Sequence, residues 1–455
     1  MHSIYANKVF LDEDWHHDVR LKIDNGYIEK IEHDVLLDSE DISLDIVIPG
    51  LCNAHSHSFQ RALSGHTEYQ QDKNKDNFWT WRKKMYHLVD QIDASRFTAI
   101  VTQAYLEMIA NGYTSVIEFH YLHREGAGDD FNNLIFHALL EAANASGIRL
   151  IYTPILYQRG GFLDEELSSQ QRKFYATTEE LLSHYEYAES MLNAPHSLAI
   201  GVHSLRAVTE DALRKIVEFR DQKDIPIHIH ISEQQKEVDD FYKLNNLRPV
   251  EWLLQNFKVD ENWCLVHATH INEEELNLLA KSGAVVCICP TTEANLGDGI
   301  FKLKDYLKQN GLFAIGSDSN ISINPFEELR WLEYVQRLIT KERNIASNLN
   351  MGSGQYLFNK ALVGGAQSTG NSSLGTIKQG GCADLLALTN SNPSLAGHNS
   401  NTLLDAIVFS NQNAIIDKVM IHGKWVTPNE LPELCLTTRK KYQATVDEIF
   451  SKEVF

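Results

Sequence analysis

Apolar segments of strand length alternate with segments of helical periodicity from about residue 46 to about residue 320. Runs such as Ile46–Asn53 and Thr114–His120 are short and largely apolar, as strands buried on both faces are. The segment Arg96–Asn111 instead carries apolar residues at helical spacing, and Gly112 follows it as a helix C-cap. Apolar strands separated by helices indicate a parallel sheet.

Eight strand segments of this kind predict an α/β fold, a (β/α)8 barrel of the TIM type. The alternative is an open doubly wound sheet, but no Gly-x-Gly-x-x-Gly motif follows an early strand. The expected strands are Ile46–Asn53, Thr114–His120, Ile148–Tyr157, Leu198–Ser204, Ile225–Ser232, Trp263–Ala268, Ala284–Pro290 and Leu312–Ser319.

The two ends of the chain differ from its middle. Residues 1–48 consist of short alternating strands and turns, and strand-like pieces return at 384–388 and 417–426 after a stretch rich in Gly and Ser. We expect residues 1–48 and 376–430 to form one small β-sandwich domain beside a barrel of residues 49–375. Residues 431–455 are expected to form a C-terminal surface helix.

The overall composition narrows the classes of partner. A formal net charge of -20 disfavours a nucleic-acid surface. The six cysteines are scattered, with no disulfide framework and no cysteine-based zinc site. The N-terminal residues lack the basic and apolar regions of a signal peptide, and no apolar run reaches the roughly 18 residues that span a bilayer. The sequence therefore predicts a cytoplasmic protein with a small-molecule substrate and no membrane or nucleic-acid partner.

Polar residues gather at the carboxyl ends of the expected strands, where barrels place their catalytic groups. A single histidine in such a position is most often structural. Several on one rim are costly to bury unless they are paired, and a divalent cation would pair them. Three histidines and one carboxylate make a reasonable zinc set that leaves a position for water. The strand-end residues are His55, His57, His120, His203, His228, His230, His267 and Asp318.

The fifth strand offers two histidines on one face, His228 and His230. His230 is the better candidate ligand because it lies nearer the carboxyl end. Glu233 follows three residues later, where the chain leaves the strand, and a carboxyl group there can move protons beside a metal site. The alternative role for Glu233 is that of an acid at a helix N-terminus.

Four motifs, "NAHSH", "HISE", "VHATH" and "GSDS", together resemble the amidohydrolase superfamily, in particular its mononuclear deaminases. The resemblance implies a metal ion held by His55, His57, His230 and Asp318. It assigns acid–base and electrostatic roles to Glu233, His267 and Asp318. Binuclear members carry a lysine after the fourth strand, where this chain has "GVHSLRAV", so one metal ion is expected.

Four longer segments, "HSFQRALSG", "NFWTWRKKMY", "EFHYLH" and "HSLRAV", are similar to a narrower family, the formimidoylglutamate deiminases. This resemblance implies hydrolysis of N-formimino-L-glutamate to N-formyl-L-glutamate and ammonia, a step of histidine degradation. Zn²⁺ is the expected cofactor, although His/Asp sites also accept Fe²⁺ and Mn²⁺. A homodimer is expected. The resemblance assigns substrate binding to Gln60, Arg82, Tyr121, His203 and Arg206.

The chemistry of the substrate agrees with two of these residues. Forked guanidinium groups suit the two carboxylates of the glutamate part, which makes Arg82 and Arg206 sensible anchors. Arg82 lies in an aromatic run, so a purely structural, stacked arginine is the alternative there.

Two other functions compete with this interpretation. The first is a related deaminase that acts on a nucleobase, nucleoside or triazine, but a ring substrate would not need two carboxylate anchors. The second is a metal-free barrel that serves as a scaffold. A scaffold has no reason to keep four potential ligands together with Glu233, and metal analysis of the purified chain distinguishes it.

The predicted ligand set has a direct test. Because His55, His57, His230 and Asp318 are expected to hold an essential metal ion, a chelator should abolish activity and added Zn²⁺ should restore it. Asp318→Ala should lose metal or activity while circular dichroism shows an intact fold. Full activity in a preparation shown to be free of metal would contradict the assignment.

Overall fold

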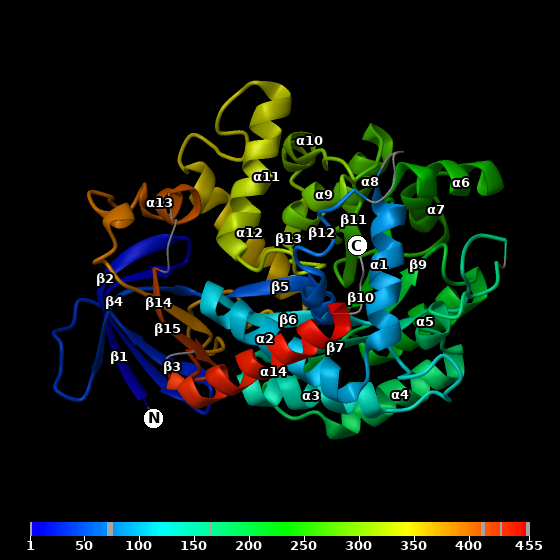
Figure 1. Cartoon of the computed structure of the whole chain (residues 1–455). Coiled ribbons are helices and arrows are strands. Elements are labelled where there is room, and N and C mark those ends of the chain that lie inside the picture. The colour runs from blue at the N-terminus through cyan, green and yellow to red at the C-terminus, as the bar shows by residue number, and fades with distance from the viewer. Residues whose placement is uncertain (1, 71–75, 164, 411–414, 428–429, 452–455) are drawn as a thin grey trace.

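The computed structural model describes residues 2–70, 76–163, 165–410, 415–427 and 430–451. Its centre is a sheet of parallel strands that confirms the expected barrel (Figure 1). Eight of them follow one another around the sheet in chain order: β5 (Leu51–Ser56), β6 (Tyr113–His120), β7 (Arg149–Leu156), β9 (Ile200–Ser204), β10 (Ile227–Ile231), β11 (Trp263–His267), β12 (Val285–Ile288) and β13 (Leu312–Ile315). The two-residue strand β8 (Ser197–Leu198) pairs with β7 beside this path.

The barrel closes between its first and last strands just beyond the end of β13. The amide of Asp318 donates to the carbonyl of His55 (3.0 Å), and the amide of His57 donates to the carbonyl of Asp318 (2.9 Å). The side chain of Asn53 accepts from the amide of Ser317 (2.9 Å). The carboxyl ends of the two strands are therefore joined through the residues that carry the expected metal ligands.

The barrel interior contains small side chains beside β-branched ones such as Ile117 and Val266. Cys52, Ala54, Cys264, Cys287 and Ala314 belong to one buried cluster. The described cysteines are all free thiols. Small residues suit this position because strands on all sides leave little volume for each side chain.

Helices form the outer layer, and their ends follow the expected signals. Gly112 adopts a left-handed conformation (φ 105°) at the end of the second helix, and Asn272 caps the eighth by accepting from the amide of Glu275 (2.8 Å). The helices are α1 (Phe78–Gln91), α2 (Ala94–Asn111), α3 (Leu134–Ser146), α4 (Thr178–Met191), α5 (Glu210–Lys223), α6 (Gln235–Asn245), α7 (Pro249–Asn256), α8 (Glu273–Ser282), α9 (Pro290–Leu296), α10 (Leu303–Lys308), α11 (Pro325–Thr340), α12 (Ser353–Ser368), α13 (Leu403–Phe409) and α14 (Pro432–Phe450), with 3₁₀ turns η1 (Ser58–Leu63), η2 (Gln171–Lys173) and η3 (Pro393–Leu395).

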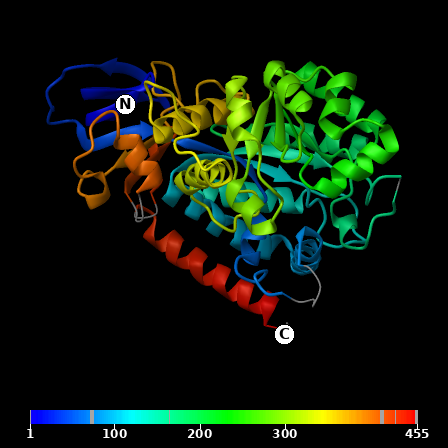
Figure 2. The same cartoon turned by 90° about the horizontal axis from the view of Figure 1, so that it is seen from above.

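Both ends of the chain form one separate sheet of seven strands, so the expected pairing of the two ends is confirmed. Strand β4 pairs in parallel with β1 and antiparallel with β14, so it joins the N-terminal strands to the C-terminal ones. In Figures 1 and 2 this sheet lies at one end of the barrel. Its order is β16 (Lys424–Trp425), β15 (Ile416–Ile421), β14 (Leu385–Leu388), β4 (Ile42–Pro49), β1 (His2–Leu11), β2 (Asp14–Asp24) and β3 (Tyr27–Glu32).

The prediction of one continuous strand over Ile46–Asn53 is wrong. The structure divides it into β4, which ends at Pro49 in the second sheet, and β5, which begins at Leu51 in the barrel. Gly50 allows the transition, because a Cβ atom there would lie 2.2 Å from the side chain of Thr114. An apolar pattern does not reveal a change of sheet, since both halves of the segment are equally buried.

The C-terminal helix α14 begins at Pro432 and ends at Phe450. It runs along the outside of the barrel against α2 (Figure 2).

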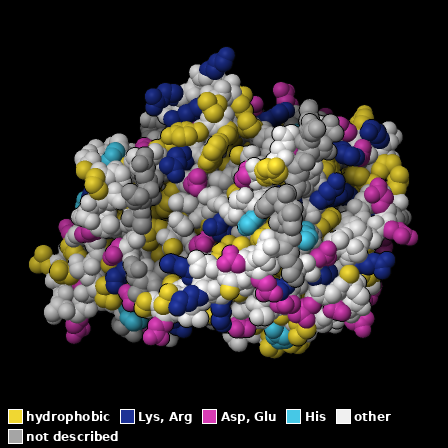
Figure 3. Space-filling model, in the orientation of Figure 1, with side chains coloured by type: hydrophobic (Ala, Val, Ile, Leu, Met, Phe, Trp, Pro, Cys, Tyr) yellow, Lys and Arg dark blue, Asp and Glu magenta, His cyan; other side chains and the backbone are white. Residues whose placement is uncertain are grey.

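None of the helices in the described residues is long and apolar enough to cross a membrane. On the face drawn in Figure 3, basic side chains lie interspersed with acidic ones.

A buried histidine predicts how the stability of this fold depends on pH. His184 on α4 pairs with the hydroxyl of Tyr152 (2.7 Å) and the amide oxygen of Asn133 (2.8 Å), and burial lowers its pKa to about 4. The unfolded chain takes up this proton below about pH 6.5. His184 therefore stabilises the fold fully above that pH, and its contribution is lost as the pH falls toward 4.

We expect His184→Gln to reduce the loss of unfolding free energy between pH 7 and pH 5. The slope removed is at most about 1.4 kcal/mol per pH unit, since one pKa unit corresponds to that energy. Urea denaturation at several pH values measures it. His17→Gln, at an exposed position on β2, is the matched control and should leave the slope unchanged. Parallel pH profiles for wild type and His184→Gln would contradict this account.

Candidate active site

The four predicted metal ligands lie together at the carboxyl end of the barrel. Nε2 of His230 lies 3.0 Å from Nε2 of His55. The Oδ1 atom of Asp318 lies 3.4 Å from Nε2 of His55 and 3.4 Å from Nε2 of His57. All four side chains are buried. The structure thus brings together three imidazoles from two strands and a carboxylate from beyond a third.

Hydrogen bonds determine which ring nitrogens can bind a metal ion. Nδ1 of His57 donates to the carbonyl of Phe119 (3.0 Å), and Nδ1 of His230 donates to the carbonyl of His203 (3.0 Å). Because a carbonyl can only accept, both Nδ1 atoms carry the proton and both Nε2 atoms present a lone pair. Burial lowers the pKa of each of these two rings and of His55, which favours the neutral, ligating form.

This donor set fits a divalent cation. Nε2 of His55 and Nε2 of His230 lie 3.0 Å apart. The proton of the His230 ring is on Nδ1, the nitrogen that faces away from His55. Nε2 of His230 therefore presents a lone pair to the space shared with His55 and the buried Asp318 carboxylate, an arrangement that suits a divalent cation. Three imidazole nitrogens and one carboxylate oxygen match the ligands that zinc prefers.

A second group of donor atoms shares Asp318. His267, Cys289 and Asp318 each offer one donor atom, and the three atoms lie within 4.8 Å of one another. Burial raises the pKa of the Cys289 thiol well above its usual value, and Nδ1 of His267 is held by Glu293 (3.2 Å). The group that includes a protonated thiol is therefore the poorer site for a metal ion.

His267 and Glu233, the predicted acid–base pair, border the same group. Nε2 of His267 lies 4.0 Å from Oε1 of Glu233 and 3.9 Å from Oδ2 of Asp318. Burial lowers the pKa of His267, but the nearby carboxylates of Glu233, Glu293 and Asp318 outweigh it and raise the pKa to about 10. Burial raises the pKa of Glu233 to about 7. The neighbouring carboxylates thus favour the protonated form of His267, and burial favours the protonated form of Glu233, an arrangement that suits proton transfer.

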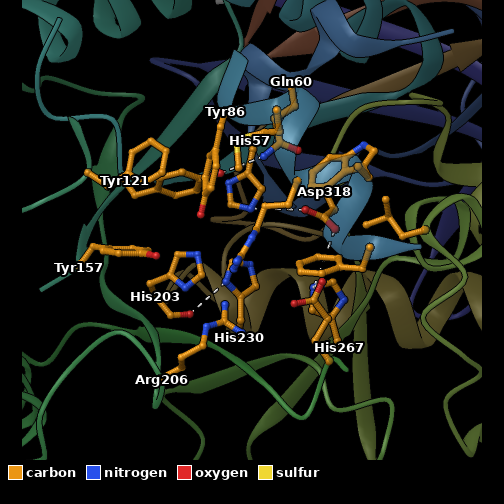
Figure 4. Close-up of a pocket in the computed structure, with 17 residues that line it drawn as sticks. His57, Gln60, Tyr86, Tyr121, Tyr157, His203, Arg206, His230, His267 and Asp318 are labelled. Carbon is orange, nitrogen blue, oxygen red and sulfur yellow. Dashed lines mark hydrogen bonds and ion pairs between the residues drawn. The ribbon is translucent and has the colours of Figure 1, made fainter. Parts of the chain in front are cut away.

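All five predicted substrate residues line the cavity beside the metal ligands (Figure 4). Gln60, from the 3₁₀ turn after β5, donates to the hydroxyl of Tyr121 (2.9 Å). The ring of His203 packs edge-on against Tyr121, with centroids 5.5 Å apart. Arg82 comes from α1, and Arg206 follows β9. The cavity therefore has a carboxylate-rich end beside the ligands and a cationic side formed by the two arginines.

The two arginines differ in their surroundings. The guanidinium of Arg82 lies over the rings of Trp79 (4.5 Å) and Tyr86 (5.5 Å), so Arg82 is both stacked and part of the cavity wall. Arg206 is buried, and its Nε atom has no hydrogen-bond partner among the described residues. A buried guanidinium with an unused donor is costly unless an acceptor arrives from outside the chain.

Sequence reasoning missed most of the aromatic wall of the cavity. Trp81 and Tyr86 come from α1, and Tyr157 and Phe174 come from segments after β7. The aromatic run around Arg82 was a visible signal for α1. No sequence signal pointed to Phe174. It lies outside every strand, in the long connection after β7, and only the path of that connection brings it to the cavity.

Two strand-end histidines do not join the site. His120 has its ring 5.8 Å from that of Phe97 on α2 and 5.5 Å from that of Tyr152. His228 donates to the carbonyl of Ser368 (3.0 Å). Both are structural, in contrast to His230.

Comparison with known proteins identifies the fold and the motifs. Residues 46–426 match the family described as "Amidohydrolase family", and residues 1–42 match "Formimidoylglutamate deiminase HutF, N-terminal domain". A formimidoylglutamate deiminase of Pseudomonas aeruginosa is 41% identical over 431 residues, which cover 94% of this chain and 94% of that protein.

Two crystal structures are similar over almost the whole chain. An amidohydrolase from Brucella melitensis has a TM-score of 0.92 and 34% identity, with 99% of this chain and 100% of that chain covered. An adenosine deaminase from Xanthomonas campestris, solved with bound zinc, has a TM-score of 0.77 and 20% identity over 97% of this chain and 98% of that chain. The latter likeness concerns the fold alone. From the family match, which spans the barrel and its four motifs, the chain belongs to the amidohydrolase family.

Proposed function

We propose that this chain catalyses the metal-dependent hydrolysis of N-formimino-L-glutamate to N-formyl-L-glutamate and ammonia, a step of histidine degradation. The observation that carries the proposal is the position of Arg206, a buried cation with an unused donor in the cavity that also contains the metal ligands. A carboxylate substrate supplies the missing acceptor. The relative from Pseudomonas aeruginosa bears the name of this activity and matches 94% of this chain.

Zn²⁺ is the proposed cofactor, held by His55, His57, His230 and Asp318. When bound, it lowers the pKa of water toward about 7 and so makes a nucleophile available at neutral pH. Three imidazole nitrogens and one carboxylate oxygen are a ligand set that zinc prefers, which supports this choice. Fe²⁺ and Mn²⁺ are the competing metals, and metal analysis of the purified chain distinguishes the three.

The chain's own residues provide the proton transfers. Asp318 is the carboxylate beside the three histidine ligands, and it accepts the proton of the attacking water. Glu293 holds Nδ1 of His267. The opposite nitrogen, Nε2, stabilises the negative charge that develops on the atoms bonded to the formimino carbon. Glu233 carries a proton to the departing ammonia, for which a pKa of about 7 is well suited.

The cavity orients the substrate by charge. The cationic formimino group lies toward Glu233 and Asp318, and the two carboxylates of the glutamate part lie toward Arg206 and Arg82. Gln60, Tyr121 and His203 provide neutral hydrogen-bonding groups between these ends. Aromatic side chains would also suit a planar ring, so a nucleobase deaminase is the second candidate. Two arginines in one cavity favour the linear dicarboxylate instead.

Three further predictions from the sequence stay predictions: a cytoplasmic location, a homodimer, and domain boundaries near residues 48, 375 and 430. Light scattering of the purified chain measures the second of these.

The function itself is tested by release of ammonia from N-formimino-L-glutamate by the zinc-loaded protein. Glu233→Gln keeps the size and hydrogen bonding of the side chain but cannot carry a proton. Since a positioned acid–base group contributes roughly 10²- to 10⁴-fold, we expect kcat to fall at least 100-fold while metal content stays the same. A loss below tenfold would assign Glu233 to the helix end rather than to proton transfer.

Substrate choice is tested by the arginines. Removing one partner of a desolvated charge pair costs about 2–5 kcal/mol, so Arg206→Met or Arg82→Met should lower kcat/KM at least about 30-fold. Formimino-glycine lacks the side-chain carboxylate, so the arginine that holds this group should matter much less for the shorter substrate. Arg214→Met, at a partly exposed position on α5, is the matched control.

The outcome that contradicts the substrate is also defined. If neither arginine distinguishes N-formimino-L-glutamate from formimino-glycine, or if guanine or adenosine is the better substrate of the wild type, only a metal-dependent deaminase of other specificity survives.

A further inference from the structure

A buried carboxylate outside the predicted site holds the turn that carries Glu233. Glu237, in the first turn of α6, accepts from the amide of Ser232 at one oxygen (3.1 Å) and from the amide of Glu233 at the other (3.1 Å). Glu237 is buried and does not line the cavity. Two consecutive backbone donors on one carboxylate determine the direction in which the chain leaves β10.

The turn held in this way is conformationally costly. Ser232 has a φ of 52°, in the left-handed region that side chains other than Gly and Asn rarely occupy. Its hydroxyl has no hydrogen-bond partner among the described residues, so the side chain itself does not stabilise the turn. The remaining polar contact is the carbonyl of Ser232, which accepts from the amide of His270 (3.0 Å).

The same carboxylate acts on the cationic side of the cavity. Burial lowers the pKa of Arg206, and negative charges outweigh this effect, with that of Glu237 the largest among them. Since arginine stays charged at any relevant pH, loss of the Glu237 charge would not discharge Arg206. It would instead remove a negative charge that competes with a carboxylate substrate.

We propose that Glu237 is a positioning residue of the reaction: its two hydrogen bonds keep the Ser232–Glu233 turn in the left-handed conformation that presents the Glu233 carboxyl group to the departing nitrogen. This inference rests on the proposed function, in which Glu233 transfers the proton. It adds a residue that touches neither substrate nor metal, and it explains how a strained turn persists directly after a metal-binding strand.

The variant Glu237→Gln separates this role from a general effect on folding. A glutamine keeps one acceptor oxygen, but its amide group faces the second backbone N–H as another donor. The turn is then held on one side only, and Glu233 is displaced. We expect kcat to fall about 10- to 100-fold, as small misplacements of reacting groups do. KM should stay the same or decrease, because substrate binding gains from the lost negative charge.

Two companion variants sharpen the test. Glu237→Asp keeps the charge and both acceptor atoms on a shorter side chain, and should retain more of kcat than Glu237→Gln. Ser232→Gly removes the steric cost of the left-handed conformation. Compared with Glu237→Gln, the double variant Ser232→Gly/Glu237→Gln should recover kcat at least about threefold, with Ser232→Gly alone as the reference.

The chain offers a matched control. Glu333 on α11 is also buried and also accepts two consecutive amides, those of Ile345 (2.8 Å) and Ala346 (2.9 Å); it pairs in addition with Arg337 (2.7 Å) and does not line the cavity. Glu333→Gln should lower the melting temperature about as much as Glu237→Gln while leaving kcat unchanged. A similar loss of kcat in both variants would show that Glu237 is merely structural.

Hydrogen–deuterium exchange tests whether Glu237 holds the Ser232–Glu233 turn without the use of any substrate. Amides of residues 231–236 should exchange faster in full-length Glu237→Gln, and those of the same segment should be unaffected in Glu333→Gln. Absence of ammonia release by the wild type would overturn the proposed function, and exchange would still decide whether Glu237 holds the turn. Unchanged exchange, unchanged kcat or loss of metal in Glu237→Gln would overturn the inference, the last because the residue would then act through His230.

Discussion

The hydrogen bonds that close the barrel are the constraint on which the site depends. The backbone of Asp318 bonds to both His55 and His57, so the first and last strands meet at three of the four proposed metal ligands. Any change that opens this junction separates ligands, and a metal ion bound across it would in turn hold the barrel closed. Left-handed conformations at Asp318 (φ 47°) and His267 (φ 70°) show that the chain turns sharply where it provides these side chains.

Around this junction, buried carboxylates hold the proposed metal-binding and catalytic groups through backbone and ring donors. Glu293 binds the far nitrogen of His267 and the amide of Cys289 (3.0 Å). Glu118 accepts from the amide of Ser58 (2.8 Å), directly after His57. With Glu237, these residues form a supporting layer in which each carboxylate is satisfied by the groups that it positions. Such a layer accounts for precise geometry in a site whose residues lie at strand ends and in the turns that follow them.

The barrel and the second sheet are joined by a buried ion pair. Arg149, at the start of β7, makes two hydrogen bonds to Asp384 (2.9 and 2.8 Å), which also accepts from the amide of His422 (2.8 Å). The carbonyl of Asp384 accepts from Gly50, where the chain passes from one sheet to the other. The second sheet therefore supports the beginning of β5, the strand that leads to His55 and His57, two of the proposed metal ligands.

The local sequence pattern was sufficient to predict much of the fold and of the candidate site of this protein. Alternating strands and helices determine a barrel, strand ends determine where chemistry can occur, and the motifs containing His55, His230, His267 and Asp318 determine the family. The break at Gly50 and the entry of Phe174 into the cavity could not be predicted, because both depend on which distant segments pack there. The same holds for the contacts of Glu237 and for the unused donor of Arg206. Hydrophobic periodicity is a property of neighbours in sequence, whereas the partners of a buried charge come from any part of the chain, and only the folded structure decides them.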